Sequence, residues 1–470
     1  MPRGAQLAGR AWVALLHWPD QQGGHAVGRH AASGDTKSGD MRSDHTQSDQ
    51  TQSDGARSAG TESGGVLDLT FTGQTPDVAP ATPDAARAAL AEMAGRAGLR
   101  RIHMLAWRDL YDPEAGGSEV HASTIAKLWA EAGIEVTMRS SYAQGHPPVG
   151  KRDGYHVIRK AGRYMVFPRA ALSELRNKYG PRDGLVEIWN GMPFLSPLWA
   201  RGPRMVFLHH LHGEMWKMTL PPNLARMGEI LEYRIAPPLY RRTPVVTLSQ
   251  SSREELIQEG FSPDKVSVVS PGVDPRFSPG GERSPTPLAV AVGRLVPVKR
   301  YDLLIKTFDE LRRRHPTLEL VITSEGYEKP ALEELVDELD ARSWVHFAGH
   351  VDDEALINLY RRAWVLVSAS AREGWGMTIT EAAACGTPAV VTRIAGHIDA
   401  VDDEHSGLLA DDPRQLVEHL DAVIGDDDFR QRLSKGALAH AARFTWAATA
   451  RGTLEVLAAD ALRRRRRPHG

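Results

Sequence analysis

The chain has 470 residues, enough for two or three domains, and its 41% hydrophobic and 25% charged residues are typical of a globular protein. Its formal net charge of −2 excludes a general nucleic-acid binder, which would carry a basic excess. The single cysteine, Cys385, excludes an intrachain disulfide and fits a reducing compartment, and no apolar run reaches the roughly 18 residues that span a bilayer. We therefore expect a cytoplasmic protein.

The first 97 residues are predicted to be a disordered, low-complexity leader. They contain Ser-Asp repeats that begin at Ser43, Ser48 and Ser53, and they offer few aromatic residues to a core. Such a polar segment cannot bury enough apolar surface to offset the entropy lost on ordering.

From residue 98 the pattern becomes regular. Residues 101–107 read as a buried strand, followed by a glycine-containing loop and an amphipathic helix over 118–133. Further strand-like runs cover 134–140, 155–161, 164–168, 185–190, 204–210 and 244–250. Helical spacers such as 169–180 and 251–260 lie among them, and this alternation predicts a parallel sheet covered by helices on both faces.

A Pro- and Gly-rich linker at 271–287 interrupts the alternation, which then begins again. The strand-like runs of the second half are 288–295, 318–324, 344–350, 364–370 and 388–394. We predict an α/β protein with two doubly wound, Rossmann-like domains, 98–280 and 281–445, that face each other across a cleft. Because open parallel sheets bind ligands at the carboxyl ends of their strands, the cleft is the expected site.

Neither half carries a dinucleotide-binding G-x-G-x-x-G or a P-loop, but both carry groups suited to phosphate. Gly116 and Gly117 precede the first helix, where glycines let backbone N–H groups approach an anion; a tight strand-to-helix turn explains them equally well. In the second half, "VGRLVPVKR" places Gly293 and Arg294 after a strand and Lys299 before a helix. Two surface cations are the alternative reading, but their place at a strand end favours phosphate binding.

The segment "EGWGMTITE" places two acids around a turn from strand to helix. Glu373 precedes the amides of Gly374, Trp375 and Gly376, and Glu381 lies early in the following helix. Paired carboxylates accept hydrogen bonds from sugar hydroxyls, whereas the alternative is stabilisation of the helix dipole, worth only about 0.3–1 kcal/mol per acid.

These motifs, in this order, resemble those of retaining glycosyltransferases of glycosyltransferase family 4, which have the GT-B fold. The similar segments are "EAGGSEVHASTIAKLWAEAGIEVT", "TLSQSSREEL", "PGVDPRF", "VGRLVPVKRYDLLI", "EGWGMTITEAAACGTPAVV" (an E-x7-E signature) and "HSGLLADD". The resemblance covers roughly residues 100–460. It implies a nucleotide-sugar donor bound mainly by the C-terminal half, an acceptor bound mainly by the N-terminal half, and a last segment, 446–470, whose helix crosses back to the first domain.

The resemblance also assigns roles. Arg294 and Lys299 would neutralise the donor diphosphate as it leaves, Glu373 would contact the sugar hydroxyls and Glu381 would hold the ribose. Gly116 and Gly117 would close over the phosphate from the opposite domain, and Gly293 would border it.

His209 matches the family histidine that contacts the donor sugar near the reacting carbon. His210 and His212 suggest a metal site, but no third ligand is evident, and we expect no metal and no cofactor besides the nucleotide-sugar co-substrate.

Three features depart from the family pattern or stay open. Ser324 stands where a glycine is usual, which either alters the nucleotide-base pocket or is neutral. Trp375 stands where Phe is common, and its bulkier ring is expected to reshape the sugar site. Asn190, within the aromatic segment 187–199, is either part of an acceptor wall or packed core. Five arginines, Arg463–Arg467, form either a solvated tail or a contact with anionic lipid at the inner membrane face.

The predicted function is retaining transfer of a sugar to a hydroxyl of a glycan, lipid or small molecule, without nucleic-acid partners. Two alternatives remain: a GT-B nucleotide-sugar epimerase that needs no acceptor, and a non-catalytic sugar-nucleotide-binding protein. Intact Arg294, Lys299 and Glu381 argue against the second of these.

Overall fold

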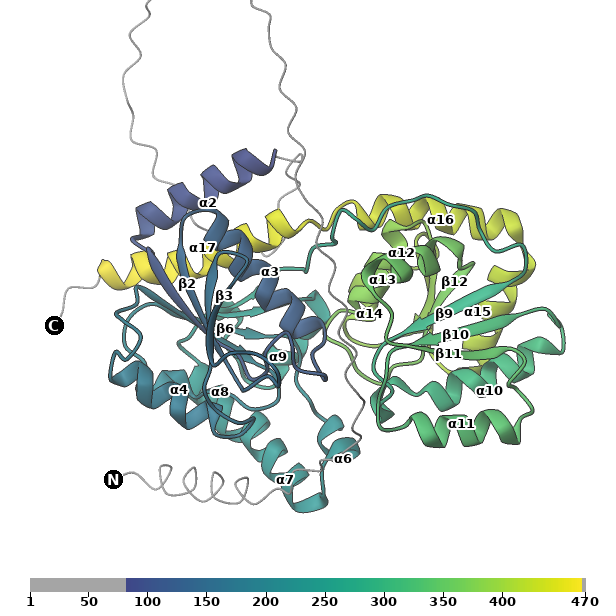
Figure 1. The fold of residues 1–470 in the computed structure, drawn as a ribbon, viewed down its shortest axis with the longest axis horizontal. Coiled ribbons are helices and arrows are strands. Elements are labelled where there is room, and N and C mark those ends of the chain that lie inside the picture. The colour runs from purple at the N-terminus through teal and green to yellow at the C-terminus, as the bar shows by residue number, and fades with distance from the viewer. Residues whose placement is uncertain (1–81, 467–470) are drawn as a thin grey trace, which may run out of the picture. The chain divides into compact units, whose positions relative to one another are not determined.

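The computed structural model describes residues 82–466, and the rest of the predicted leader and the last four residues lie outside this range. The prediction that the leader extends to residue 97 is wrong for its last part, because Pro83–Ala97 form helix α2 (Figure 1). Thr82 caps this helix by accepting a hydrogen bond from the Ala85 N–H, and Leu90 and Ala94 are buried in the core. An apolar stripe at helical spacing therefore orders this segment.

The first half contains an eight-stranded sheet in the order β3-β4-β2-β1-β5-β6-β7-β8. Its strands are β1 (Arg101–Leu105), β2 (Glu135–Ser140), β3 (Val149–Arg152), β4 (Tyr155–Arg159), β5 (Gly184–Trp189), β6 (Arg204–Leu208), β7 (Val245–Thr247) and β8 (Val266–Val268). Neighbouring strands are parallel except the β3–β4 hairpin at the edge. The central strands β1 and β5 are buried along almost their whole length, as expected for a sheet covered on both faces.

The helices of this half, after α2, connect the strands. They are α3 (Gly117–Glu131), α4 (Val166–Leu175), α5 (Ser196–Trp199), α6 (Met215–Thr219), α7 (Pro222–Ile230), the π-helical turn η1 (Leu231–Ile235), α8 (Ala236–Tyr240), α9 (Gln250–Gln258) and the 3₁₀ turn η2 (Pro263–Lys265). The predicted strand at 164–168 is wrong, because its second part opens α4. Val166, Phe167 and Ala170 face the core at helical spacing, which a short apolar run does not distinguish from a strand.

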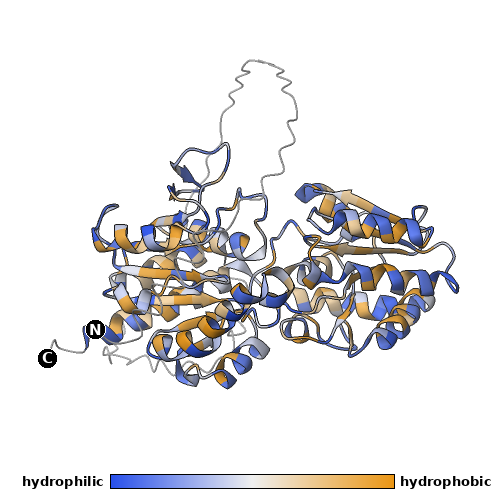
Figure 2. Ribbon diagram, turned by 90° about the horizontal axis from the view of Figure 1, so that it is seen from below, coloured by the Kyte–Doolittle hydropathy of each residue, from blue (hydrophilic) through white to orange (hydrophobic). Residues whose placement is uncertain are grey.

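The second half contains a six-stranded, fully parallel sheet in the order β11-β10-β9-β12-β13-β14. Its strands are β9 (Leu288–Val292), β10 (Glu319–Thr323), β11 (Val345–Gly349), β12 (Val365–Ser368), β13 (Ala389–Thr392) and β14 (Gly407–Ala410). Its helices are the 3₁₀ turn η3 (Pro297–Lys299), α10 (Tyr301–Arg312), α11 (Lys329–Glu338), α12 (Asp353–Arg362), α13 (Met377–Ala384), α14 (His397–Ala400), α15 (Pro413–Gly425) and α16 (Asp427–Ala441). Figure 2 shows hydrophobic strands between helices whose outer faces are hydrophilic.

The last helix, α17 (Trp446–Arg465), belongs to the core of the first half although it follows the second in sequence. The Trp129 indole of α3 donates a hydrogen bond to the Ala450 carbonyl at 3.0 Å, and the Asp460 carboxylate accepts one from the Arg204 N–H of β6 at 3.0 Å. The predicted fold class, two doubly wound α/β halves, is confirmed. Among residues 82–466, no helix is long and apolar enough to cross a membrane.

Candidate active site

The glycine loop of the first half lies against the second half. Gly116 donates its N–H to the Glu119 carboxylate at 2.8 Å, which fixes the start of α3. A Cβ on Gly116 would lie 3.9 Å from the Arg294 Nε, and a Cβ on Gly117 would lie 3.2 Å from the Met377 Sδ at the start of α13. The structure thus brings together the predicted glycines, Arg294 and the helix that follows the first acid.

Lys299 and Glu373 form an ion pair in the second half. The Lys299 Nζ lies 2.5 Å from a Glu373 oxygen, which also accepts a hydrogen bond from the Ser370 hydroxyl at 3.0 Å. Burial alone would raise the pKa of Glu373, but the Lys299 charge and these hydrogen bonds outweigh it and hold the pKa below its usual value. Glu373 is therefore ionised and already neutralised by the predicted phosphate-binding lysine.

Gly293 lies directly beside the Lys299 side chain. Its φ of 150° lies in a region that favours glycine, and a Cβ there would lie 3.1 Å from the Lys299 Cε. The buried Tyr301 hydroxyl donates to the Gly293 carbonyl at 2.6 Å. A side chain at this position would push the lysine out of place.

Glu381 has a different environment from Glu373. It lies on α13 and accepts a hydrogen bond from the Tyr360 hydroxyl of α12 at 3.3 Å. Burial raises the pKa of Glu381 to about 7, although the Tyr360 hydrogen bond works in the opposite direction. The two acids of the motif therefore differ in charge near neutral pH.

His209 follows β6 and packs against the turn that carries Glu373. A Cβ on Gly374 would lie only 2.8 Å from the His209 carbonyl oxygen, so the turn tolerates nothing larger than glycine there. The His209 Nε2 lies 3.2 Å from the His121 Nδ1 of α3, and burial lowers the pKa of His209 to about 4. The imidazole is thus neutral and is held by a second histidine that the sequence analysis missed.

His210 and His212 stack on each other with ring centroids 5.2 Å apart. Over residues 82–466, no group of three or more His, Cys, Asp or Glu side chains is arranged to hold a metal.

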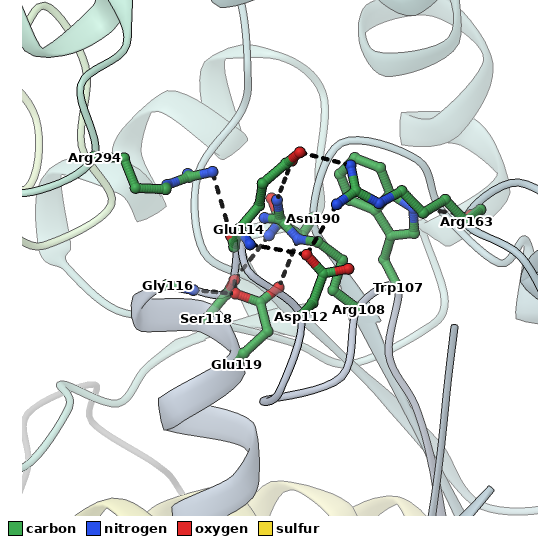
Figure 3. A network of polar contacts seen from close by, with 10 residues as sticks. All are labelled: Trp107, Arg108, Asp112, Glu114, Gly116, Ser118, Glu119, Arg163, Asn190 and Arg294. Atoms are coloured by element: carbon green, nitrogen blue, oxygen red, sulfur yellow. Dashed lines mark hydrogen bonds and ion pairs between the residues drawn. The ribbon is translucent and has the colours of Figure 1, made fainter. Parts of the chain in front are cut away.

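A network of charged side chains surrounds the glycine loop and was not predicted (Figure 3). The buried Arg108 pairs with Glu119 at 3.2 Å and reaches Glu114 at 3.5 Å. Arg163 bridges Glu114 at 2.8 Å and Asp112 at 2.9 Å. The acids of "YDPEAGGSE" are a signal in the sequence that charged partners lie nearby. Their arginine partners could not be identified from it, because one of them lies 51 residues away in sequence.

Two residues connect this network to the predicted site. The Arg294 guanidinium donates to the Glu114 carbonyl oxygen at 3.4 Å across the two halves, and Asn190 donates its amide to the Ser118 hydroxyl at 2.7 Å (Figure 3). Burial and the nearby Arg108 charge lower the pKa of Arg294, and the charges of nearby glutamates such as Glu119 and Glu114 offset this only in part. Asn190 therefore lies at the glycine loop, where an acceptor wall would be.

Arg372, directly before Glu373, was also not predicted as a site residue from the sequence. Its guanidinium donates to the Leu211 carbonyl and pairs with Glu255 of α9, both in the first half. Leu211 lies in the loop that follows β6, residues 209–213, which we call the histidine loop. The buried Glu232 carboxylate of the first half accepts hydrogen bonds from the N–H groups of His212 at 2.7 Å and Gly213 at 3.0 Å in this loop. The histidine loop is thus held from both halves.

The two departures from the family pattern also have a structural outcome. The Trp375 ring is buried in the core of the second half and lies edge-on to the Phe444 ring, with the ring centroids 5.0 Å apart. Its effect on the sugar pocket stays a prediction. Ser324 takes the positive φ of 87° that a glycine would tolerate better.

Part of the arginine tail is already engaged. Arg463 and Arg464 both pair with the buried Asp460, and Arg467 lies outside the described residues. The contact of this tail with lipid stays a prediction.

Comparison with known proteins assigns the class. Residues 115–277 match the model of Glycosyltransferase Family 4, and residues 275–440 match that of Glycosyl transferases group 1. The chain belongs to glycosyltransferase family 4, as its sequence motifs predicted, and it is a glycosyltransferase.

Several relatives share the name D-inositol 3-phosphate glycosyltransferase. A D-inositol 3-phosphate glycosyltransferase of Corynebacterium urealyticum is 35% identical over 388 residues, which cover 73% of this chain and 90% of that enzyme. One of Stackebrandtia nassauensis is 36% identical over 78% of this chain and 93% of that enzyme. The match to the enzyme of Frankia alni, at 38% identity, spans about half of that protein, 52%.

Solved structures show the same GT-B fold. Sucrose-phosphate synthase from Thermosynechococcus elongatus superposes with a TM-score of 0.65 at 20% identity, covering 75% of this chain and 97% of that one. Anabaena HepE in complex with UDP and glucose gives 0.60 at 19% identity, covering 77% of this chain and 100% of that one.

Proposed function

We propose that the cleft transfers a sugar from a nucleoside-diphosphate sugar to an acceptor hydroxyl with retention of configuration. The observation that carries the proposal is that the Gly116–Gly117 loop of the first half meets Arg294 and Met377 of the second. Met377 opens the helix directly after the turn that carries Glu373, the partner of Lys299. Two cations and backbone N–H groups at a helix start are suited to a diphosphate, and their charge stabilises it best as it leaves.

In this mechanism, Glu373 and neutral His209 hold the sugar and Glu381 holds the ribose. Glu373 is tied to Lys299, so neither it nor the paired His209 is a free nucleophile. The bond between the anomeric carbon and the phosphate oxygen breaks as the acceptor oxygen bonds from the same face. The acceptor proton passes to an oxygen of the departing nucleoside diphosphate, whose negative charge Arg294 and Lys299 stabilise as it leaves. No metal ion is required in this proposal.

The relatives guide the choice of substrates. Because relatives that align over most of their length are named D-inositol 3-phosphate glycosyltransferases, and HepE binds UDP and glucose, uridine diphosphate sugars and inositol phosphates are the first pairs to test. The proposed acceptor is a small polyhydroxylated molecule that enters beside Asn190.

The test is a transfer assay with uridine, guanosine and adenosine diphosphate sugars against an acceptor panel, read by mass spectrometry and by the anomeric coupling in proton NMR. We expect product with the donor's anomeric configuration from the wild type, strong loss in Glu373→Gln, and no loss in Glu334→Gln, an exposed acid of α11. An inverted product would contradict retention. Epimerised donor without acceptor would favour the epimerase, and full turnover by Glu373→Gln would refute the site.

A further inference from the structure

Helix α9 of the first half begins against the second half. Its first two N–H groups, those of Gln250 and Ser251, donate to the Asp399 carboxylate of α14 at 2.8 Å and 3.2 Å. The first N–H groups of a helix have no acceptor inside the helix, and a negative charge near them is favourable. Ser249 caps the next N–H, that of Ser252, at 3.1 Å. The cap of α9 is therefore built from both halves, and its charged part comes from the second.

The Ser251 hydroxyl adds a second link to α14. It donates to the Asp399 carboxylate and accepts a hydrogen bond from the Gly396 N–H at 2.8 Å. Gly396 directly precedes α14, so both bonds join the start of one short helix to the start of the other. We call Ser251, Gly396 and Asp399 the α9–α14 contact.

The α9–α14 contact adjoins the turn at residues 373–376. Gly396 has a φ of 84°, and a Cβ there would lie 2.8 Å from the Glu373 carbonyl oxygen and 2.7 Å from the Trp375 nitrogen. The Gly396 backbone thus packs directly on the backbone of this turn. Because packed backbones transmit displacement, a shift of α14 would move the turn that carries Glu373.

The same contact is connected to His209 through the first half. Helix α9 follows β7, and the Thr247 hydroxyl of β7 donates to the His209 carbonyl oxygen at 3.3 Å. A Cβ on Gly374 would lie 2.8 Å from that same carbonyl oxygen. The path from Asp399 therefore runs through both halves and closes where the turn meets His209.

A second side chain of the second half also holds α9. Arg372, directly before Glu373, pairs with Glu255 of this helix. The turn is therefore flanked in sequence by Arg372 on one side and Asp399 on the other, and both bind the same helix of the opposite half.

An ordinary helix cap does not require such a distant residue. Asp412 caps α15 by accepting the Gln415 N–H at 2.8 Å, so cap and helix are neighbours in the chain. The partners of Asp399, by contrast, lie 148 and 149 residues away in the other half. The Asp399 cap fixes two halves to each other as well as stabilising a helix.

We propose that Asp399 is a positioning residue for the transfer reaction. It holds α9 against α14, so that Glu373 and His209 keep their places on either side of the reacting sugar. This inference rests on the proposed function and adds to it a residue that acts through others. A displacement of about 1 Å in reacting groups can cost about a hundredfold in rate although every group is still present.

The experiment compares the wild type with Asp399→Ala, Asp399→Asn and the matched control Asp412→Ala, which removes a helix cap that lies within the second half. The transfer assay gives kcat and the donor KM, and calorimetric titration gives the nucleotide affinity. Pulsed electron paramagnetic resonance gives the distance between the halves, with spin labels on Lys178→Cys and Glu334→Cys, both at exposed positions. The chain's only cysteine, Cys385, is buried, so these two positions can be labelled selectively.

We expect Asp399→Ala to lower kcat by about tenfold to a hundredfold and to leave the nucleotide affinity unchanged, because Arg294 and Lys299 stay in place. Its distance distribution should broaden. Asp399→Asn should fall between this variant and the wild type, because its amide oxygen can accept one N–H but carries no charge. Asp412→Ala should keep the wild-type kcat and distances, and all variants should keep the wild-type circular dichroism.

Three results would overturn the proposal: a wild-type kcat in Asp399→Ala, an equal loss of kcat in Asp412→Ala, or a wild-type distance distribution in Asp399→Ala. The distance measurement needs no turnover, which keeps the two proposals distinct. If the wild type transfers no sugar to any acceptor, the proposed function fails, and the distances alone decide whether Asp399 holds the halves. If the wild type is active and Asp399→Ala is equally active, the positioning role alone is refuted.

Discussion

Removing Lys299 should expose how strongly the site depends on its own ion pair. The side chains of Lys299 and Glu373 are 22% and 19% exposed, so the pair lies between a surface pair, worth under about 1 kcal/mol, and a fully buried pair, whose disruption costs about 3–5 kcal/mol. We expect Lys299→Met to lower the free energy of unfolding by about 2 kcal/mol, because it leaves the Glu373 carboxylate without its cation. In a half of this size, that corresponds to a fall of about 5 °C in Tm.

The effect should depend on pH with a definite sign. The pKa of Glu373 in the folded protein is lowered, so its ionised form stabilises the fold above the unfolded value of about 4.3, and this contribution is lost as the pH falls through the folded pKa. Without Lys299, burial dominates and the pKa of Glu373 rises. The difference between wild type and Lys299→Met should therefore be largest near neutral pH and should shrink in acid.

The assay is urea denaturation of the wild type, Lys299→Met, Glu373→Gln and the double variant at neutral and acidic pH. The double variant should be more stable than the sum of the single losses implies, with a coupling of about 1–2 kcal/mol. Strictly additive losses, or a loss from Lys299→Met that is the same at both pH values, would refute the reasoning.

Three further predictions concern other parts of the site. Glu381, with a pKa of about 7, should make nucleotide affinity rise from about pH 6 to about pH 8, because only the ionised acid accepts both ribose hydroxyls, and calorimetric titration of Glu381→Gln should show a flat profile. The same raised pKa removes stability of the free protein as the pH rises from the unfolded value of about 4.3 to the folded value of about 7. Gly374→Ala should cost about 1–3 kcal/mol by thermal denaturation, since its Cβ would lie 2.8 Å from the His209 carbonyl oxygen, whereas Gly162→Ala, with open space around it, should cost little. Arg372→Gln should lower kcat at least about tenfold with unchanged nucleotide affinity, because it frees the histidine loop without touching the donor; an equal loss of affinity would contradict this role.

The sequence was sufficient for the alternation of elements and for the residues at strand ends. The spacing of apolar residues in strands and the glycines in turns are local signals. The two sheets, and the positions of Arg294, Lys299 and Glu373 after strand ends, could therefore be predicted from them. The run at 164–168 was ambiguous for the same reason, because a short apolar run fits a strand and the start of α4 equally well.

The missing parts of the site depend on contacts between distant segments. Arg372 acts through a carbonyl 161 residues earlier in the chain, and His121 meets His209 across 88 residues. Neither residue has a local pattern that distinguishes it from an ordinary surface arginine or core histidine. Trp375 shows the reverse case, since its place in the motif suggested the pocket but its ring packs in the core.

The most direct test of the central claim is calorimetric titration of nucleoside diphosphates into the wild type, Arg294→Ala and Lys299→Ala. If the cleft binds the diphosphate of a nucleotide sugar, at least one nucleotide should bind the wild type, and each variant should weaken it by about tenfold or more. If no nucleotide binds the wild type, or if both variants bind as the wild type does, this cleft is not the donor site.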